Sequence, residues 1–291
     1  MADGAVIARL FKALTLAALL AALGLSPAGA QGRRDSGWIT DQSGCRVWDP
    51  VPEPNESVSW SGACVSGLAN GKGVLQWFVR GRPTDRYEGD FVAGHETGHG
   101  IVVSAGGNRY EGEWKNDLKE GHGVEQWANG NRYEGEWKDD RRNGHGVFTD
   151  RNGDRYDGDW VNDDRNGQGA EVWANGDRYE GQWFHGNPHG HGVYTYANGT
   201  RYEGNFTNGV ATGKGTLTLK DGGRYEGEIR NNLPNGQGEF VDKNGGHFTG
   251  KWVNGCYLQE TPRSQPDYTR GTAGTYNVQR AAAGVPASDC P

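Results

Sequence analysis

Two patterns in this sequence have the residue types and spacing of catalytic or metal sites. Residues 95–99 read His-Glu-Thr-Gly-His, which is the H-E-x-x-H string of zinc proteases. That chemistry needs a helix, which brings both histidines to one face and leaves the glutamate as the base. Pairs of acids two residues apart, such as Glu111 with Glu113 and Glu134 with Glu136, resemble acid–base dyads. The elements that hold these residues decide whether either pattern is a site.

Histidines also recur along the chain at a fixed interval. His99, His122 and His145 follow one another at intervals of 23 residues, and His191 comes two intervals later. In a sheet with two strands per repeat, such histidines would lie roughly 9–10 Å apart. Histidines that share one zinc place their nitrogens about 2 Å from the metal. His189 lies close to His191, but no third ligand is evident, so we expect no metal site.

The histidine interval belongs to a repeat that covers most of the chain. A triplet of Tyr, an acid and Gly recurs every 23 residues, and Phe-Thr-Gly at 248–250 continues the series. With the Tyr as position 1, position 5 is mostly aromatic and positions 3, 12, 14 and 21 are Gly. Residues 60–62 (Trp-Ser-Gly) look like an earlier, looser repeat. The repeat tyrosines are Tyr87, Tyr110, Tyr133, Tyr156, Tyr179, Tyr202 and Tyr225.

Each apparent site is therefore one repeat position seen several times. A catalytic pair occurs once, whereas an acid pair in nearly every repeat indicates a solvated face. The string at 95–99 falls on a loop and the start of a strand, and position 12 of the repeat supplies its glycine. We therefore predict no catalytic residue and no enzyme.

Each repeat is predicted to form two strands. Residues 131–137 alternate between polar and apolar side chains, which indicates a strand. Residues 122–128 are an example of the second strand of a repeat. The Asn-Gly pair at 152–153 predicts a two-residue type I′ turn, which needs positive φ at both central residues. Positions 7 to 11 predict a longer polar connection. The expected fold is an all-β, single-layer antiparallel β-meander of 23-residue repeats, elongated and twisted.

The two-residue turn also predicts which side chains share a face. Positions 1, 3 and 5 would lie with positions 13 and 15, and the acids at 2 and 4 with Arg at 23 and with positions 16 and 18. The rings would form the core of a thin sheet, and they are also the best candidate contact surface. The predicted binding residues are Tyr110, Trp114, Tyr133, Trp137, Tyr156, Trp160, Tyr179 and Trp183.

Composition agrees with a thin sheet and limits the partners. Gly accounts for 50 of 291 residues, and the 11 Trp, 12 Tyr and 8 Phe stand beside a single Met. The formal charge is -7, from 30 basic and 37 acidic residues. Nucleic acid requires a basic face, so the charge argues against it. It also weakens the case for an anionic lipid surface.

The N-terminus has the pattern of a signal peptide. Arg9 and Lys12 precede an apolar run at 13–25, and Ala-Gly-Ala at 28–30 is a small-residue cleavage site. The alternative is a membrane anchor, for which the run is shorter than the roughly 20 residues that a span needs. We expect residues 1–30 to be removed and the protein to be exported to a periplasmic or extracellular compartment.

Four cysteines follow the predicted signal peptide, and export permits disulfides between them. Cys45 and Cys64 lie before the regular repeats, whereas Cys256 and Cys290 lie at or after the last one. Three pairings exist. The pairs Cys45–Cys64 and Cys256–Cys290 would each staple one end, whereas the others would join opposite ends of a long sheet.

The pattern Tyr-Glu-Gly-Glu-Trp-x6-Gly-x-Gly-x6-Gly resembles the MORN repeat, the membrane occupation and recognition nexus family. Residues 133–137 with Gly144, Gly146 and Gly153 show it most clearly. The segments at 45–50 and 60–64 resemble the N-terminal region of exported bacterial MORN proteins. The resemblance implies a β-meander with a role in recognition or scaffolding, and it implies no reaction.

The expected organisation has four parts. A capping segment at 31–59 follows the signal peptide, a repeat sheet of eight to nine units covers 60–256, and a C-terminal tail at 257–291 covers the last strand. Some MORN proteins carry a lipid kinase or methyltransferase domain beside the repeats. We expect no such domain here, because the flanking segments are too short.

The expected function is that of a non-catalytic exported scaffold for protein–protein interaction or envelope assembly, without a cofactor or metal. Its partner would be a protein or another cell-envelope component, and open sheet edges favour a homodimer. The alternative is a cell-wall or glycan binding protein, because exposed Trp and Tyr rings stack on sugars. Contact with a phospholipid surface is a third interpretation, which the acidic charge does not favour.

Overall fold

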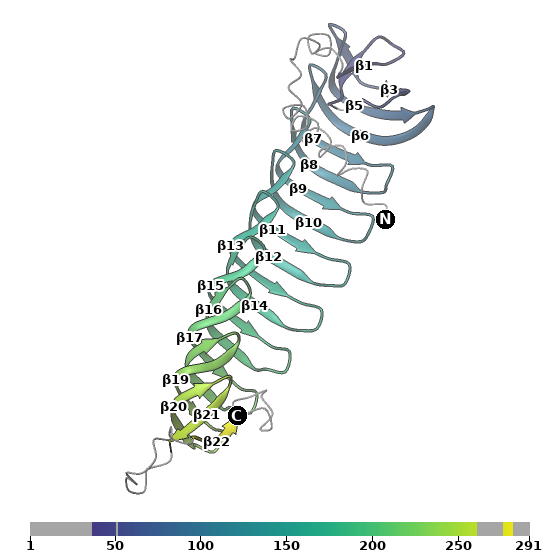
Figure 1. Ribbon diagram of the computed structural model, residues 1–291. Helices are drawn as coiled ribbons and strands as arrows, with labels where there is room; N and C mark the ends of the chain where they lie inside the picture. The colour runs from purple at the N-terminus through teal and green to yellow at the C-terminus, as the bar shows by residue number, and fades with distance from the viewer. Residues whose placement is uncertain (1–36, 51, 261–275, 282–291) are drawn as a thin grey trace, which may run out of the picture. The chain divides into compact units, whose positions relative to one another are not determined.

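The computed structural model describes residues 37–50, 52–260 and 276–281 (Figure 1). The predicted signal peptide at 1–30 lies outside these residues. The chain divides into two compact units on either side of the boundary between Gly121 and His122. The described part of the first unit comprises 37–50 and 52–121, and that of the second comprises 122–260 and 276–281.

Every regular element among the described residues is a β-strand. No helix there is long and apolar enough to cross a membrane. The strands are β1 (Trp38–Thr40), β2 (Arg46–Trp48), β3 (Glu56–Trp60), β4 (Ala63–Val65), β5 (Leu68–Val79), β6 (Arg82–Val92), β7 (His95–Val103), β8 (Arg109–Lys115), β9 (Leu118–Gln126), β10 (Arg132–Lys138), β11 (Arg141–Thr149), β12 (Arg155–Val161), β13 (Asp164–Val172), β14 (Arg178–Phe184), β15 (Asn187–Thr195), β16 (Arg201–Thr207), β17 (Val210–Thr218), β18 (Arg224–Arg230), β19 (Leu233–Val241), β20 (His247–Val253), β21 (Cys256–Glu260) and β22 (Tyr276–Ala281).

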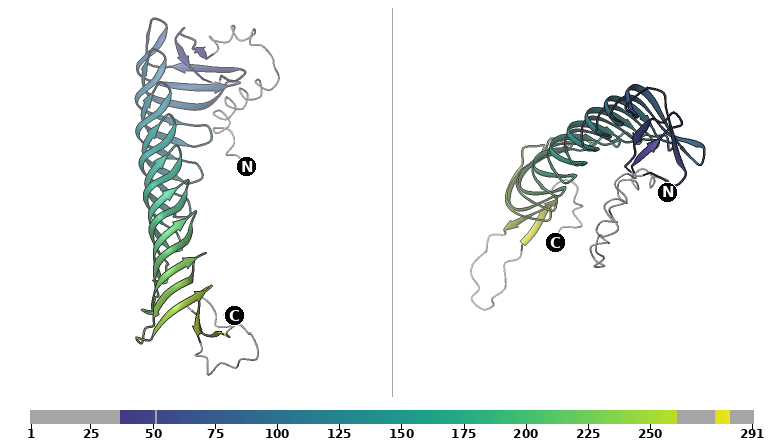
Figure 2. Two further views of the ribbon diagram at one scale, coloured as in Figure 1. Left: turned by 60° about the vertical axis from the view of Figure 1, so that its left-hand side comes forward. Right: turned by 90° about the horizontal axis from the view of Figure 1, so that it is seen from above.

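The predicted fold class is confirmed. In the second unit each repeat supplies two strands, and consecutive strands from β10 to β22 pair antiparallel with one another. This is an all-β antiparallel meander of 23-residue repeats, and its sheet is not closed. Figure 2 shows the strands of this unit curving in the same sense from one repeat to the next.

The type I′ turn lies at the other end of the hairpin from the one predicted. Residues 139–140 connect β10 to β11, and both take positive φ, 48° for Asp139 and 64° for Asp140. The predicted long connection at positions 7 to 11 is thus a two-residue turn. Its twist matches that of the flanking strands, which is why hairpins favour it.

The Asn-Gly pair instead belongs to a five-residue loop at 150–154. Asp150 N–H donates to the carbonyl of Asp154 at 2.9 Å, and Gly153 N–H donates to the carbonyl of Asp150 at 3.1 Å. Of these five residues only Gly153 takes a positive φ, 97°. This is a type I turn closed by a left-handed glycine, the other common hairpin loop. The prediction of a type I′ turn at Asn152-Gly153 was therefore wrong. The Asn-Gly dipeptide is common both in type I′ turns and in loops that end a type I turn with a left-handed glycine.

The longer loop shifts the register by one residue and changes the faces. Tyr156 pairs with Phe148 at position 16 of the preceding repeat, and Gly158 pairs with Gly146 at position 14. Positions 1, 3, 5, 14 and 16 therefore share one face, called here the core face. Positions 2, 13 and 15 share the outer face with Arg at 23, because Asp157 pairs with Val147. The predicted places of positions 13, 15 and 16 were wrong, since a one-residue slip turns every side chain over.

In the second unit a bulge follows the position 3 glycine where the two strands of one repeat pair, from β10–β11 to β18–β19. Between the pairs Gly135–Gly146 and Trp137–Arg142, β11 contains two more residues than β10. Gly144, at position 12, takes a φ of 71° within the longer stretch. Such a bulge needs a left-handed residue and adds bend and twist to the strand. The glycine at position 12 thus serves the curvature that encloses the rings on the core face.

The first unit begins with a modified repeat. β3 pairs antiparallel with β5, and Trp60 lies opposite Leu75. A methyl group on Gly73 would overlap the Trp60 ring, as one on Gly146 would overlap Tyr133. The Trp60 indole Nε1–H donates to the carbonyl of Ala63 at 2.9 Å. Residues 60–62 therefore form the looser repeat that the sequence indicates, with Trp in the place of Tyr.

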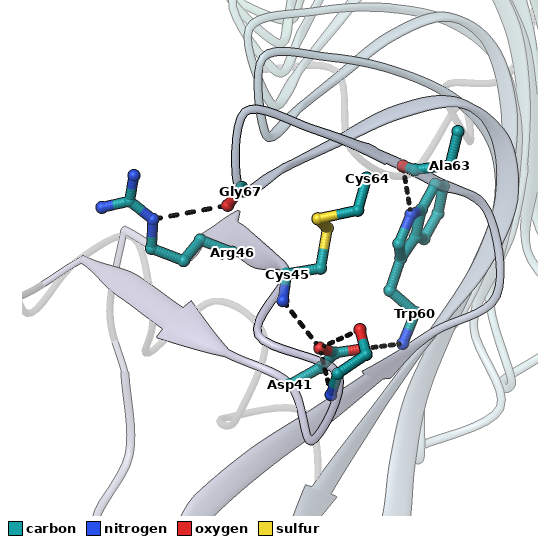
Figure 3. The surroundings of a disulfide bond; sticks show 8 residues. Asp41, Cys45, Arg46, Trp60, Ala63, Cys64 and Gly67 are labelled. Atoms are coloured by element: carbon teal, nitrogen blue, oxygen red, sulfur yellow. Dashed lines mark hydrogen bonds between the residues drawn. A yellow bond between two sulfur atoms is a disulfide. The ribbon is translucent and has the colours of Figure 1, made fainter.

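The predicted disulfide between Cys45 and Cys64 is present, with Cα atoms 5.7 Å apart (Figure 3). Asp41 organises the surrounding chain, since its carboxylate accepts the backbone N–H groups of Ser43 and Cys45, each at 2.9 Å, and of Trp60 at 3.3 Å. The bridge thus ties the segment before the repeats to the first repeat.

Part of the C-terminal tail pairs with the last strand. β22 lies antiparallel to β21, with Leu258 opposite Val278. Apart from Cys256, β21 itself belongs to the predicted tail, and it pairs with β20, the last strand before the tail. Cys256 is buried in this region, and its predicted partner Cys290 lies outside the described residues.

Candidate functional site

All eight rings predicted to bind a partner lie on the core face and are buried. In the first unit Tyr110 is 1% exposed and Trp114 is 8% exposed. The other six belong to the second unit, and none is more than 5% exposed. Their role in binding stays a prediction, whereas the structure gives each of them a place in the core. The six are Tyr133, Trp137, Tyr156, Trp160, Tyr179 and Trp183.

The tyrosines and tryptophans alternate in an edge-to-face series. The Tyr133 ring centroid lies 5.1 Å from that of Trp137 in its own repeat and 5.5 Å from that of Trp160 in the next. The interplanar angles are 88° and 85°. Edge-to-face pairs at such distances contribute about 0.5–1.5 kcal/mol beyond their burial. The series therefore links each repeat to its neighbour.

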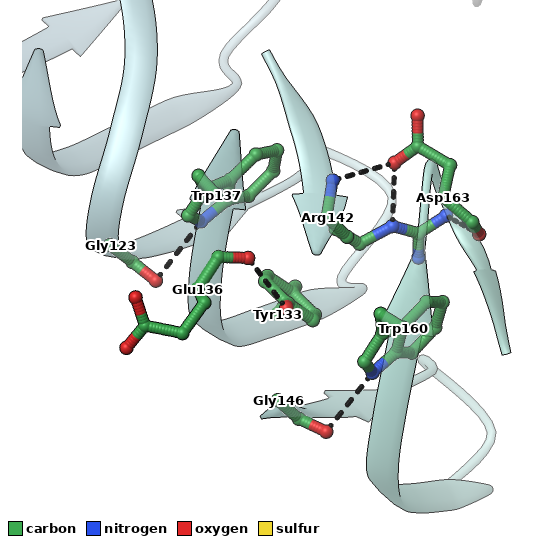
Figure 4. A network of polar contacts seen from close by, with 8 residues as sticks. All are labelled: Gly123, Tyr133, Glu136, Trp137, Arg142, Gly146, Trp160 and Asp163. Atoms are coloured by element: carbon green, nitrogen blue, oxygen red, sulfur yellow. Dashed lines mark hydrogen bonds and ion pairs between the residues drawn. The ribbon is translucent and has the colours of Figure 1, made fainter. Parts of the chain in front are cut away.

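The polar atoms of these rings are also satisfied inside the protein (Figure 4). The Tyr133 hydroxyl donates to the carbonyl of Glu136 at 3.0 Å, and Trp137 Nε1–H donates to the carbonyl of Gly123 at 3.2 Å. Trp160 repeats the second contact with Gly146 at 3.1 Å. Core rings thus keep no free donor for a ligand.

Burial also changes how the core tyrosines ionise. It raises the pKa of Tyr179, Tyr202 and Tyr225 to about 12. Removing a phenol from water disfavours its charged form. These hydroxyls stay protonated and act as hydrogen-bond donors at neutral pH.

Cations at position 10 cover part of the ring series. The Arg142 guanidinium lies 4.3 Å from the Trp160 ring centroid, and its Nε–H donates to the Asp163 carboxylate at 3.0 Å (Figure 4). Arg165 instead pairs with Glu171 at 2.6 Å, where the carboxylate side chain is only 5% exposed. Burial raises the pKa of Glu171, and the Arg165 guanidinium opposes this effect. Both arginines support the fold.

In the second unit the outer-face acids at position 2 are paired with arginine and not with the acids at position 4. In the second unit Arg132 contacts Glu134 at 2.6 Å, and the same contact between positions 23 and 2 recurs in the next four repeats. The Arg132 guanidinium lowers the pKa of Glu134. His145, at position 13, lies 3.3 Å from Asp157 on this face. The predicted solvated face is thus a ladder of ion pairs.

A groove runs between these side chains in the second unit. Its floor is the backbone of glycines at positions 3 and 14, whose rows meet in pairs such as Gly204–Gly215 and Gly227–Gly238. The volume is about 610 Å³. We call it the glycine groove, and its polar lining comprises His191, Glu203, Lys214, Thr216, Glu226, Glu228, Gln237 and Thr249.

The H-E-x-x-H string lies in the first unit wholly on a strand, β7, so the prediction that it begins on a loop was wrong, because the turn before β7 ends at Gly94. His95 Nδ1 lies 2.5 Å from the Asp117 carboxylate, and Glu96 N–H donates to the same carboxylate at 2.7 Å. His99 lies opposite Glu113 in the neighbouring strand. No group of three potential ligands capable of holding a metal ion occurs among the described residues. His95, Glu96 and His99 thus each have a partner in a neighbouring strand or turn, as expected of repeat positions.

The structure also shows an exposed edge that we did not predict as a site. It is formed in the second unit by the five-residue loops 127–131, 150–154, 173–177 and 196–200, and we call it the loop edge. Asp154 accepts the backbone N–H of Ala174 in the next loop at 2.8 Å, and Asp177 accepts that of Ala197 at 2.8 Å. The recurrent Asp or Asn at position 22 was the available sequence signal.

A comparison with family models matches the MORN repeat at 65–81 and without interruption from 87 to 247, in eight repeats that together cover more than half of the chain. The chain belongs to the MORN repeat family. The matched MORN repeats are those whose Tyr, Trp and Gly build the core face. Their number agrees with the eight to nine predicted.

Other comparisons add little to the MORN assignment. No curated protein matches the chain. Among solved structures, the SAS-4 (dCPAP) TCP domain of Drosophila melanogaster, in complex with a proline-rich motif of Ana2 (dSTIL), is 11% identical. The match covers 68% of this chain and 93% of that one, with a TM-score of 0.31. A streptogramin B lyase is 12% identical over 70% and 90% of the two chains, with a TM-score of 0.15. At such TM-scores neither structure bears on the function of the MORN repeats.

Proposed function

We propose that this MORN repeat protein is a non-catalytic exported scaffold that binds a partner protein, or another component of a cell envelope, through its outer face. The observation that carries this proposal is the glycine groove. It lies on the face opposite the buried rings, so an occupant can contact it without disturbing the core.

The groove suits an extended protein segment. Its floor is backbone on this face, because the glycines of both rows turn toward the core rings, as Gly215 does toward Tyr202. Side chains of positions 2, 13 and 15 form the walls, and a partner backbone can approach the floor between them. Its walls carry both signs of charge, with Lys214 opposite Glu228 across the strands and Glu226 paired with Arg224 at 2.7 Å. Mixed charge favours a polypeptide over nucleic acid, which requires a basic surface.

The repetition of the outer face supports a non-catalytic role. The same Arg–acid contact occurs in one repeat after another, so these outer-face carboxylates share one environment and not the two distinct ones that separate an acid from a base. A surface made of similar repeats can instead bind a partner at several neighbouring points.

Export rests on the signal peptide pattern at 1–30 and is supported by the disulfide between Cys45 and Cys64. Disulfides persist in oxidising compartments and are rare in the cytosol. A periplasmic or extracellular location would place the scaffold among envelope proteins. Attaching to the C-terminus a reporter enzyme that folds only after export would test this; an active reporter is expected, and an intact fusion whose reporter is inactive would contradict it.

Site-specific photo-cross-linking tests the binding proposal. A photoreactive amino acid at Gln237, in the groove, should capture a defined partner in intact cells. The matched control is the same amino acid at Val161, which is 46% exposed and lies outside the groove. A partner captured at Gln237 and competed by unlabelled protein supports the proposal. Equal capture at both positions, or none at Gln237, contradicts it.

A further inference from the structure

The loop edge of the second unit presents a set of fixed aromatic rings. Trp173 and Tyr196 each occupy the first position of a five-residue loop. Trp173 N–H donates to the carbonyl of Asp177 at 2.9 Å, and Tyr196 N–H donates to that of Thr200 at 2.8 Å. Asp177 links the two loops, since its carboxylate accepts the Ala197 N–H. The backbone that carries both rings is therefore held in place.

Three rings form one cluster on this edge. Trp173 stacks on Tyr194, with ring centroids 5.4 Å apart and an interplanar angle of 29°. Tyr194 contacts Tyr196 at 4.7 Å, and Tyr196 remains 42% exposed. The Tyr194 hydroxyl donates to the Asp177 carboxylate at 2.8 Å, which fixes the middle ring. The cluster thus offers two outer rings supported by a third.

The polar atoms of the two outer rings distinguish them from the core rings. Among the described residues, neither the Trp173 indole N–H nor the Tyr196 hydroxyl has a hydrogen-bond partner. Every core Trp with an indole contact gives its N–H to a backbone carbonyl, as Trp183 does to Gly169 at 3.1 Å. Tyr and Trp combine an apolar face with a polar tip, and here the tip is open to a ligand.

Charge narrows the ligand class. Asp177 lies within the cluster, and its hydrogen bonds, first among them that from Ala197, lower the pKa of its carboxyl. An ionised carboxylate beside the rings repels an anion, as does the formal charge of -7 on the chain. A neutral ligand with flat apolar faces and many hydroxyls matches both the rings and their free donors.

We propose that Trp173 and Tyr196 form a binding site for a neutral polysaccharide. Sugar rings would stack on the two aromatic faces, and the indole N–H and the phenol hydroxyl would donate to sugar hydroxyls. The rings occupy the same position in consecutive repeats, which places their backbones roughly 9–10 Å apart at two strand spacings. That separation is close to one disaccharide of an extended β-linked chain. The site is independent of the glycine groove and goes beyond the proposed function.

Isothermal titration of the full chain with neutral β-linked hexaoses of glucose and of N-acetylglucosamine tests the site. At least one hexaose should bind, and both Trp173→Ala and Tyr196→Ala should weaken it by about tenfold, as expected for loss of an aromatic contact. Trp173→Phe should weaken it less, because the stacking face remains while the N–H donor is lost.

Leu219→Ala is the matched control, since Leu219 holds the same loop position in the next repeat without a ring. It should leave hexaose affinity unchanged. Because Trp173 packs on Tyr194, the Trp173→Ala variant needs a thermal melt, whereas the exposed Tyr196 gives the second, fold-independent test. Failure of both hexaoses to bind, unchanged affinity in Tyr196→Ala, or binding of only an arginine-rich peptide would overturn the proposal.

Discussion

The phenol ring of Tyr133 lies directly against Gly146, so that a methyl group on this glycine would overlap the ring and hydroxyl. The contact recurs between positions 1 and 14, as for Tyr156 with Gly169 and Tyr179 with Gly192. The sheet can enclose a large ring in a single layer because its backbone there carries no side chain. The glycines at position 14 therefore follow from the tyrosines at position 1, whereas those at positions 12 and 21 serve the bulge and the loop.

Gly146→Ala should accordingly destabilise the protein. The added methyl group must displace the ring of Tyr133, and overpacking of this kind costs about 1–3 kcal/mol. Urea unfolding measures the change. Gly106→Ala is the control, because only Ser104 Oγ, at 3.8 Å, lies near the new methyl group. An equal loss in both variants would show that the overlap with Tyr133 is not the cause.

Tyr133→Phe should lower the free energy of unfolding by about 1 kcal/mol, because it removes the hydrogen bond to the Glu136 carbonyl while keeping the ring. The same change at Tyr196 should have almost no effect, since that hydroxyl has no partner among the described residues. Chemical denaturation of both variants makes the comparison, and equal losses would contradict the role given to the core hydroxyls.

Stability should fall in strongly alkaline solution. The unfolded phenol ionises near its ordinary pKa of 10.0, whereas burial raises the pKa of Tyr179, Tyr202 and Tyr225 to about 12. Between these values the unfolded chain releases protons that the folded chain retains, so rising pH favours unfolding. The stability that these buried, protonated phenols contribute is fully present below pH 10.0 and is lost as the pH approaches about 12. Urea midpoints over this range should drop less steeply in Tyr202→Phe, and parallel curves would contradict the assignment.

The ion pair of Arg165 with Glu171 should behave as a buried one. Arg165→Ala leaves the carboxylate of Glu171 buried without its cation, which costs about 3–5 kcal/mol. Replacing both residues, Arg165→Met with Glu171→Leu, should recover most of that loss.

The exposed pair of Arg178 with Glu180 provides the control for this experiment, with side chains 51% and 60% exposed. Arg178→Ala should change stability by about 0–1 kcal/mol, since solvent screens the pair. Thermal or urea unfolding of the three variants, compared with the unchanged protein, tests the contrast. Similar losses of stability from Arg165→Ala and Arg178→Ala would show that burial of Glu171 does not increase the cost of removing its arginine.

The repeat spacing predicted much of this fold, because the period and the strand alternation depend on local residue types. The aromatic and glycine positions, the antiparallel meander and the Cys45–Cys64 pair could all be inferred. The interpretation of residues 95–99 as repeat positions also holds, since they lie on β7 with partners from neighbouring strands.

The turns and faces could not be read in the same way. Asn152-Gly153 fits a type I′ turn as well as the end of a type I turn, and only the hydrogen bonds from Asp150 and Gly153 decide between them. The choice of turn type moved the register by one residue and so exchanged the predicted faces of positions 13, 15 and 16. The loop edge was missed because its cluster joins Trp173 to Tyr194, whose contact depends on this register.

The central claim is that the buried rings hold the sheet together while exposed surfaces bind partners. Tyr133→Ala combined with Trp137→Ala tests it most directly, by measuring the melting temperature together with partner capture at Gln237 below that temperature. We expect the melting temperature to fall by several degrees or more, because each truncation of a buried aromatic costs about 3–5 kcal/mol, while capture by the folded fraction persists. An unchanged melting temperature with loss of capture would contradict the claim and make these rings the contact surface.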